Sequence, residues 1–221
     1  MRNKECWYYK VCNNDCEGCI RYIEMKYLMD SSGIPTAQQI PKRLTAETAA
    51  DKKAFQKLQT IKENIVKWVA AGKNLYICSP SVGTGKTSWA IKLMLRFFDQ
   101  IWSGNGQTVR GLFVHVPTLL LQLKNFENPV SEEYKQNLLD ADLIIWDDIA
   151  ASTKISEYDY AQLLMFIDSR IFNEKSNIYT SNITNKEDLE NILGARLVSR
   201  IYNASEIVTF EGKDGREVYK K

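Results

Sequence analysis

The stretch SPSVGTGKTS, residues 79–88, has residue types and spacing that suit the binding of a nucleotide polyphosphate. In the pattern G-x-x-x-x-G-K-[ST], backbone N–H groups surround the phosphates, the lysine neutralises the β and γ oxygens, and the hydroxyl residue holds Mg²⁺. Pro80 stands where the first glycine of this pattern is usual. The alternative is a glycine turn that precedes Lys-Thr by chance, but the strand expected before it and the helix expected after it favour a phosphate loop. The expected nucleotide-binding residues are Gly83, Thr84, Gly85, Lys86, Thr87 and Ser88.

An acidic pair follows the apolar segment LIIW, residues 143–146, as the second half of such a site requires. We expect Asp147 to bind Mg²⁺ together with Thr87, and Asp148 to orient and polarise the attacking water. Asp148 is one methylene shorter than a glutamate and reaches about 1.5 Å less far. Lys86, Asp147 and Asp148 therefore predict an ATPase whose hydrolysis is slow or depends on DNA or a partner. The alternative is a pair of solvated aspartates at the end of a strand.

Short apolar strands alternate with helical stretches after residue 72, which indicates an α/β domain with a parallel sheet covered by helices on both faces. Apolar residues at helical spacing predict a helix over 51–71, and Gly72 stands where it would stop. The C-terminal segment, 206–221, reads as a strand and a turn, so no helical lid is expected. The predicted strands are 74–79, 112–116, 143–146, 177–181 and 206–210.

Four of the five cysteines lie in the first 19 residues, with the spacing C-x5-C-x3-C-x2-C. Tetrahedral thiolate coordination of Zn²⁺ would supply the folding energy that so short a segment cannot obtain from packing. The alternative is four reduced thiols in a loosely ordered tail. Cys78, inside a predicted strand, is expected in the core. The predicted zinc ligands are Cys6, Cys12, Cys16 and Cys19.

Composition limits the alternatives further. The 221 residues, 44% hydrophobic and 25% charged, suffice for one core and a small appendage. A formal net charge of +2 is too small to indicate a nucleic-acid protein. No apolar run approaches a membrane span or a signal peptide, so we expect a cytoplasmic protein with no membrane contact. The expected organisation is a cysteine-rich head over 1–29, a linker over 30–50 and an ATPase domain over 51–221.

Residues 50–221 resemble the AAA+ domain of bacterial and phage replicative helicase loaders of the DnaC/DnaI type, with the IstB-like transposition ATPases as relatives. The resemblance rests on the phosphate loop, on LIIWDDI, on FIDSRIFNEKSNIYTSN and on LGARLVSRIY. It implies an ATP-dependent loader that binds the hexameric replicative DNA helicase and helps to place it on single-stranded DNA during replication initiation. It also implies that ATP closes the loader subunits into a spiral homo-oligomer.

The same resemblance assigns roles to residues outside the two motifs. Asn182 matches the sensor position, where an amide holds the water or the γ-phosphate. Arg200, with Arg196 one helical turn earlier, resembles the arginine finger that a neighbouring subunit presents to the nucleotide. The alternatives are a turn residue at a strand end and two ordinary surface arginines.

Contacts with single-stranded DNA are implied for two segments, 123–128 and 152–160. Charge, hydroxyl and stacking rings suit such contacts, although lysines beside aromatic residues are also common at partly buried surfaces. His115, inside a predicted strand, is expected to be buried and structural. The expected DNA-binding residues are Phe126, Lys154, Ser156 and Tyr158, with Lys124 in addition.

Two other functions stay open on the sequence. One is a transposition-associated ATPase that binds duplex DNA, and the other is a nucleotide-dependent adaptor that hydrolyses ATP inefficiently. Copurification with a hexameric helicase would favour the loader, duplex binding the first alternative, and slow turnover with both partners present the second.

Overall fold

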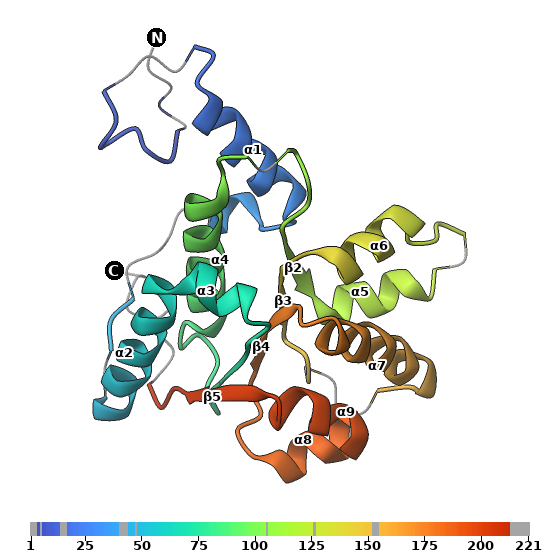
Figure 1. The fold of residues 1–221 in the computed structure, drawn as a ribbon. Coiled ribbons are helices and arrows are strands. Elements are labelled where there is room, and N and C mark those ends of the chain that lie inside the picture. Colours follow the sequence, from blue (N-terminus) through green and yellow to red (C-terminus); the bar gives the residue numbers. More distant parts are fainter. Residues whose placement is uncertain are drawn as a thin grey trace.

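The computed structural model describes residues 4, 6–13, 17–39, 44–46, 48–104, 106–125, 127–151 and 155–212. Helices and strands alternate along the chain after a helical N-terminal part (Figure 1). The elements are α1 (Ile20–Ser31), η1 (Thr36–Gln38), α2 (Ala49–Glu63), α3 (Ile65–Ala70), β1 (Asn74–Cys78), α4 (Lys86–Ile101), β2 (Gly111–His115), α5 (Val116–Leu123), α6 (Glu132–Asp140), β3 (Leu143–Asp147), α7 (Glu157–Phe172), β4 (Ser176–Ser181), α8 (Lys186–Leu193), α9 (Ala195–Tyr202) and β5 (Ser205–Thr209).

The five strands form one sheet in the order β2-β3-β4-β1-β5, and every neighbouring pair is parallel. All five strands predicted from the sequence exist, and each predicted end lies within one residue of the observed end. In a parallel sheet the carboxyl ends of all strands meet at one edge, where ligands bind in open α/β folds. The ends of β1, β3 and β4 therefore bring the phosphate loop, the acidic pair and Asn182 to the same edge.

Side chains of successive strand residues enter two different cores, as the pleat of a strand requires. On β1, Leu75 and Ile77 pack with α1, α2, α3 and α4 on one face of the sheet. Tyr76 and Cys78 pack with α5 to α9 on the other face. Cys78 is fully buried, so the expectation that it belongs to the core is confirmed.

The helix predicted over residues 51–71 is interrupted at Asn64, which separates α2 from α3. The Asn64 backbone lies outside the helical region, at φ −110° and ψ 21°. Its side-chain Nδ2 donates to the carbonyl of Thr60 at 3.0 Å, which competes with regular helix hydrogen bonds. The interruption lets Ile65 and Trp68 both turn into the core.

The N-terminal helix α1 packs against the core formed by the sheet and α4. Met25, Leu28 and Met29 are buried in the same cluster as α4, and α1 lies beside the end of α4 in Figure 1. Tyr8 Oη and Arg21 Nη2 both donate to Asp99 Oδ1 near the end of α4, at 2.5 and 2.7 Å. Burial, followed by the bond to Asp99, raises the pKa of Tyr8 to about 12.

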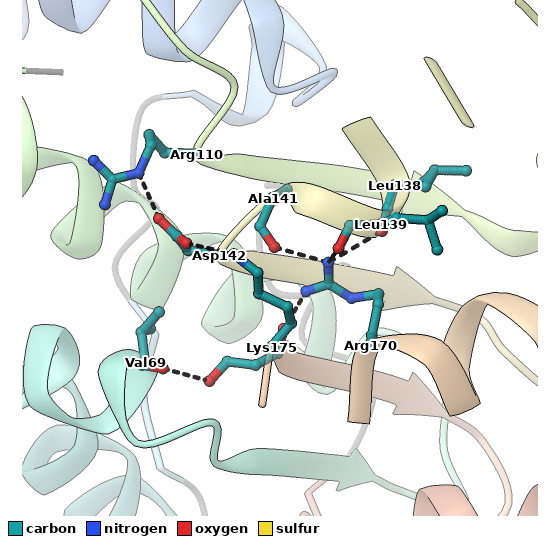
Figure 2. A network of polar contacts seen from close by, with 9 residues as sticks. Val69, Arg110, Leu138, Leu139, Ala141, Asp142, Arg170 and Lys175 are labelled. Carbon is teal, nitrogen blue, oxygen red and sulfur yellow. Dashed lines mark hydrogen bonds and ion pairs between the residues drawn. The ribbon is translucent and has the colours of Figure 1, made fainter. Parts of the chain in front are cut away.

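A buried arginine joins the end of α6 to the amino end of β4 (Figure 2). The Arg170 side chain of α7 is fully buried and donates hydrogen bonds to acceptors on α6, on the connection that follows α6, and on β4. Close by, Asp142 accepts hydrogen bonds from Arg110 and Lys175. The acceptors of Arg170 are the carbonyls of Leu138, Leu139, Ala141 and Ser176 and the side-chain oxygen of Asn177.

Within the described residues, none of the helices has the length and apolar character needed to cross a bilayer. The described chain ends at residue 212, and no helix follows β5 up to that point.

Candidate functional site

The phosphate loop connects the end of β1 to the first turn of α4. Gly83 and Gly85 have φ values of +69° and +94°, a backbone conformation that residues with a Cβ rarely adopt. A Cβ at Gly85 would also come within 3.2 Å of the Leu44 side chain. Both glycines are therefore needed for the loop to turn back and expose its N–H groups at the start of α4, where the helix leaves them unpaired.

Lys86 is the first residue of α4 and only 6% exposed. Its Nζ donates to the backbone carbonyl of Ser81 at 3.0 Å, so the side chain crosses the loop that it belongs to. The Thr84 hydroxyl is buried in the same loop, and no described residue forms a hydrogen bond with it. A buried hydroxyl of this kind costs free energy unless a ligand satisfies it, which fits a loop that encloses phosphate oxygens.

Asp147 joins the loop to the acidic strand. Its Oδ1 accepts hydrogen bonds from Thr87 Oγ1 and from Thr180 Oγ1, each at 2.7 Å. Burial raises the pKa of Asp147, the two threonine hydrogen bonds oppose the rise, and the charge of Asp148 adds to it. Among the described residues no hydrogen-bond donor reaches Asp147 Oδ2, so this oxygen is the one free to face a cation.

Asp148 lies directly after β3 in an unusual conformation, with φ at +55°. Its N–H donates to Thr180 Oγ1 at 3.1 Å, which fixes the turn. Its Oδ2 lies 3.9 Å from Nε2 of His115, the last residue of β2. The expectation that His115 is buried was wrong: its side chain is 44% exposed, because β2 ends there and its edge of the sheet is open.

The donor set suits ATP and Mg²⁺. Magnesium prefers hard oxygen ligands and keeps several waters, and Thr87 with Asp147 offers a hydroxyl and a carboxylate oxygen already in contact. The glycine loop, the buried lysine and the unpaired hydroxyl of Thr84 suit a polyphosphate. The nucleotide would occupy the loop, and the cation would lie beside Thr87 and Asp147.

Asn182 is exposed directly after β4 and thus at the same sheet edge as Asp147 and Asp148. The structure places it beside the acidic strand, because β3 and β4 are neighbours. Its role as a sensor of the γ-phosphate stays a prediction.

The two arginines of α9 both pair with Asp168 of α7. Arg200 Nε lies 2.7 Å from Asp168 Oδ1, and Arg196 Nη2 lies 3.8 Å from Asp168 Oδ2. The Arg200 side chain is 46% exposed, so a neighbouring molecule can reach it. Sequence reasoning did not identify Asp168, which only the packing of α9 on α7 brings into contact.

The two segments expected to bind DNA meet in space. Lys124, at the end of α5, lies 2.6 Å from Asp159 of α7, and Tyr158 Oη donates to the carbonyl of Leu123 at 3.0 Å. Ser156 caps α7 by exchanging hydrogen bonds with Asp159. Phe126 and Lys154 lie outside the described residues. The segments thus form one surface, and Lys124, Ser156 and Tyr158 also stabilise the fold there.

Three of the four head cysteines lie among the described residues. Cys6, Cys12 and Cys19 are half-buried free thiols, and Cys16 lies outside the described residues. Among the residues that the structure describes, no group of three or more potential ligands is placed to hold a metal ion.

Thr180 and His115 are the residues near the acidic pair that sequence reasoning missed. A threonine in a strand is common, so Thr180 gave no signal except that it precedes the polar pair Ser181-Asn182 at the strand end. His115 could have been found by noting that it closes its strand next to the acidic one.

The fold is similar to several solved structures. A crystal structure of the DnaC helicase loader gives a TM-score of 0.64 at 23% identity, covering 76% of this chain and 93% of that one. DnaI gives 0.64 at 19%, covering 83% and 94%. The replication initiator DnaA, bound to AMPPCP and single-stranded DNA, gives 0.58 at 18%, covering 76% and 49%. No family model and no curated protein matches the sequence. The chain therefore has the fold of the solved DnaC helicase loader, of DnaI and of DnaA.

Proposed function

We propose that this protein is an ATP-dependent helicase loader that binds ATP with Mg²⁺, hydrolyses it slowly, and helps to place a hexameric replicative helicase on single-stranded DNA. The observation that carries the nucleotide part is the 2.7 Å hydrogen bond from Thr87 to Asp147, because it joins the phosphate loop and the acidic strand at one cation position. The similarity in fold to the DnaC and DnaI helicase loaders supports the loading part. The DnaA structure bound to single-stranded DNA supports that ligand.

Each residue of the site has a separate role in hydrolysis. The loop N–H groups and Lys86 bind and orient the phosphates, and Thr87 with Asp147 holds the cation. Bound Mg²⁺ supplies positive charge that neutralises the phosphate oxygens. Asp148 accepts a hydrogen bond from the attacking water and polarises it, and Asn182 holds the water or the γ-phosphate from the neighbouring strand.

Arg200 acts on the nucleotide of the adjacent subunit in this proposal. In the single chain its guanidinium is paired with Asp168. An ion pair between such exposed side chains contributes only about 0 to 1 kcal/mol, so a developing negative charge on a neighbour's phosphate can replace it. ATP would then hold subunits together in a spiral, and hydrolysis would require assembly.

The head and the DNA surface complete the proposal. The four head cysteines would bind one Zn²⁺ and present the head to the helicase. The surface between the end of α5 and the start of α7 would contact single-stranded DNA through exposed Tyr158 and the segments beside it.

The test of the nucleotide part uses three variants. Lys86→Ala should abolish ATP binding, because the phosphates lose their main cation. Lys92→Ala is the matched control on the same helix, since its Nζ lies over the Trp89 ring, 4.6 Å from the ring centroid; this variant should bind ATP like the parent. Asp148→Asn should bind ATP and stop hydrolysis. Titration with a fluorescent ATP analogue and phosphate release measure both.

The test of the loading part mixes the protein with a hexameric helicase from a candidate host and with single-stranded or duplex DNA. ATP-dependent complex formation and helicase transfer onto single strands are the expected results.

Two outcomes would contradict the proposal. Normal ATP binding by Lys86→Ala would contradict the assignment of residues 83–88 as the phosphate loop. Tight binding to duplex DNA without any binding to helicase would instead indicate the transposition ATPase.

A further inference from the structure

One threonine of β4 contacts both acidic residues of the site. The last register pair of β3 and β4 is Trp146 with Tyr179, so the next residues on the two strands are Asp147 and Thr180. Thr180 is fully buried. Its hydroxyl donates to Asp147 Oδ1 at 2.7 Å and accepts the N–H of Asp148 at 3.1 Å.

A hydroxyl group is suited to this double contact because it has one proton to donate and lone pairs to accept. Its proton points to the carboxylate expected to hold the cation, and its oxygen faces the backbone of the residue expected to polarise water. Thr87 donates to the same oxygen of Asp147, so two hydroxyls fix Oδ1 and leave Oδ2 without a donor among the described residues. The contact therefore decides which oxygen of Asp147 is available.

The contact with Asp148 bears on backbone strain. A residue with a Cβ at a φ of +55° is held in an unfavourable backbone conformation, which contacts with the surrounding structure must stabilise. Thr180 supplies two hydrogen bonds to this turn: its hydroxyl accepts from Asp148, and its backbone carbonyl accepts from the N–H of Ile149 at 3.1 Å. Only the first depends on the side chain.

We propose that Thr180 is the positioning residue of the site, which sets the rotamer of Asp147 and holds the Asp148 backbone in its left-handed conformation through one hydroxyl. This inference rests on the proposed ATPase function for its consequence, since the two carboxylates are the groups expected to act on Mg²⁺ and water. The two contacts of Thr180 themselves lie within the chain and do not depend on a bound nucleotide.

The experiment compares Thr180→Val, which keeps the shape and loses the hydroxyl, with Thr180→Ser, which keeps the hydroxyl. Thr180→Val should speed amide exchange at Asp148 by about tenfold or more without nucleotide, because the N–H loses its acceptor. It should also weaken Mn²⁺ binding in the presence of ADP by about 10- to 100-fold, as the loss of outer contacts to metal ligands does. Thr180→Ser should restore both towards the parent.

Ser176→Ala is the matched control at the other end of β4. It removes a buried hydroxyl that donates to the carbonyl of Val69 at 3.1 Å, so it should destabilise the fold and change neither Asp148 exchange nor Mn²⁺ affinity. Parental exchange and Mn²⁺ affinity in Thr180→Val would overturn the inference, as would failure of Thr180→Ser to restore them. If the parent binds no ATP, the proposed function fails, while amide exchange at Asp148 still decides this inference.

Discussion

Replacing Arg170 by methionine should destabilise the fold by about 3 kcal/mol. Burial lowers the pKa of Arg170 to about 10, and a fall from the ordinary 12.5 corresponds to about 3 kcal/mol spent on removing the charge from water. Methionine avoids that cost but leaves three close acceptors without their donor, namely the carbonyls of Leu138, Ala141 and Ser176. At about 2 kcal/mol for each orphaned buried carbonyl, the loss is about 6 kcal/mol and the net about 3 kcal/mol.

Urea unfolding, followed by tryptophan fluorescence, measures this difference. Arg170→Lys should lose at least as much as Arg170→Met, since it keeps the buried charge but not the planar group that reaches several carbonyls at once. Lys175→Met is the control: Lys175 pairs with half-exposed Asp142 at 3.0 Å, and such a pair contributes about 1 kcal/mol or less. A loss below about 1 kcal/mol for Arg170→Met, or a Lys variant close to the parent, would refute the reasoning.

Three further predictions concern the site and the head. Arg200→Ala should keep ATP affinity within a few-fold and lose ATP-dependent assembly, because the finger acts on the transition state; mixed with Asp148→Asn it should recover hydrolysis above the sum of the separate variants, measured by phosphate release. Burial raises the pKa of Asp147. At pH values above the ordinary pKa of an aspartate, the cost of ionising this buried carboxyl group therefore lowers the free energy of unfolding. The gain in unfolding free energy of nucleotide-free Asp147→Asn over the parent should therefore grow from about pH 4 to pH 7 and be absent below both pKa values. Protein purified without chelator should contain about one equivalent of zinc; elemental analysis below about half an equivalent would count against the head site.

The sheet and its loop were predictable because their signals are local. Strands buried on both faces read as short apolar runs, and all five were found. The glycines of the phosphate loop and the acidic pair after β3 follow patterns whose backbone context the sequence also shows. Their positions at one sheet edge then followed from parallel pairing alone.

The contacts that shape the site were not predictable, because they depend on register and packing. Thr180 meets Asp147 only because β4 pairs with β3 in one register, and Asp168 meets Arg200 only because α9 packs on α7. The exposure of His115 depends on β2 being the edge strand. The break at Asn64 arises from a side-chain bond to a nearby carbonyl, which helical periodicity does not reveal.

The burial of α1 against α4 and the sheet limits how this protein can be divided. Met25, Leu28 and Met29 pack with α4, and the N–H of Phe113 on the edge strand β2 donates to the carbonyl of Ser32 at 2.7 Å. A truncation that begins after Ser32 would expose this apolar face of α4 and leave the Phe113 N–H without its acceptor. A chimera with another protein of this fold should therefore exchange α1 together with the surface of α4 that receives it, since the two pack as one unit.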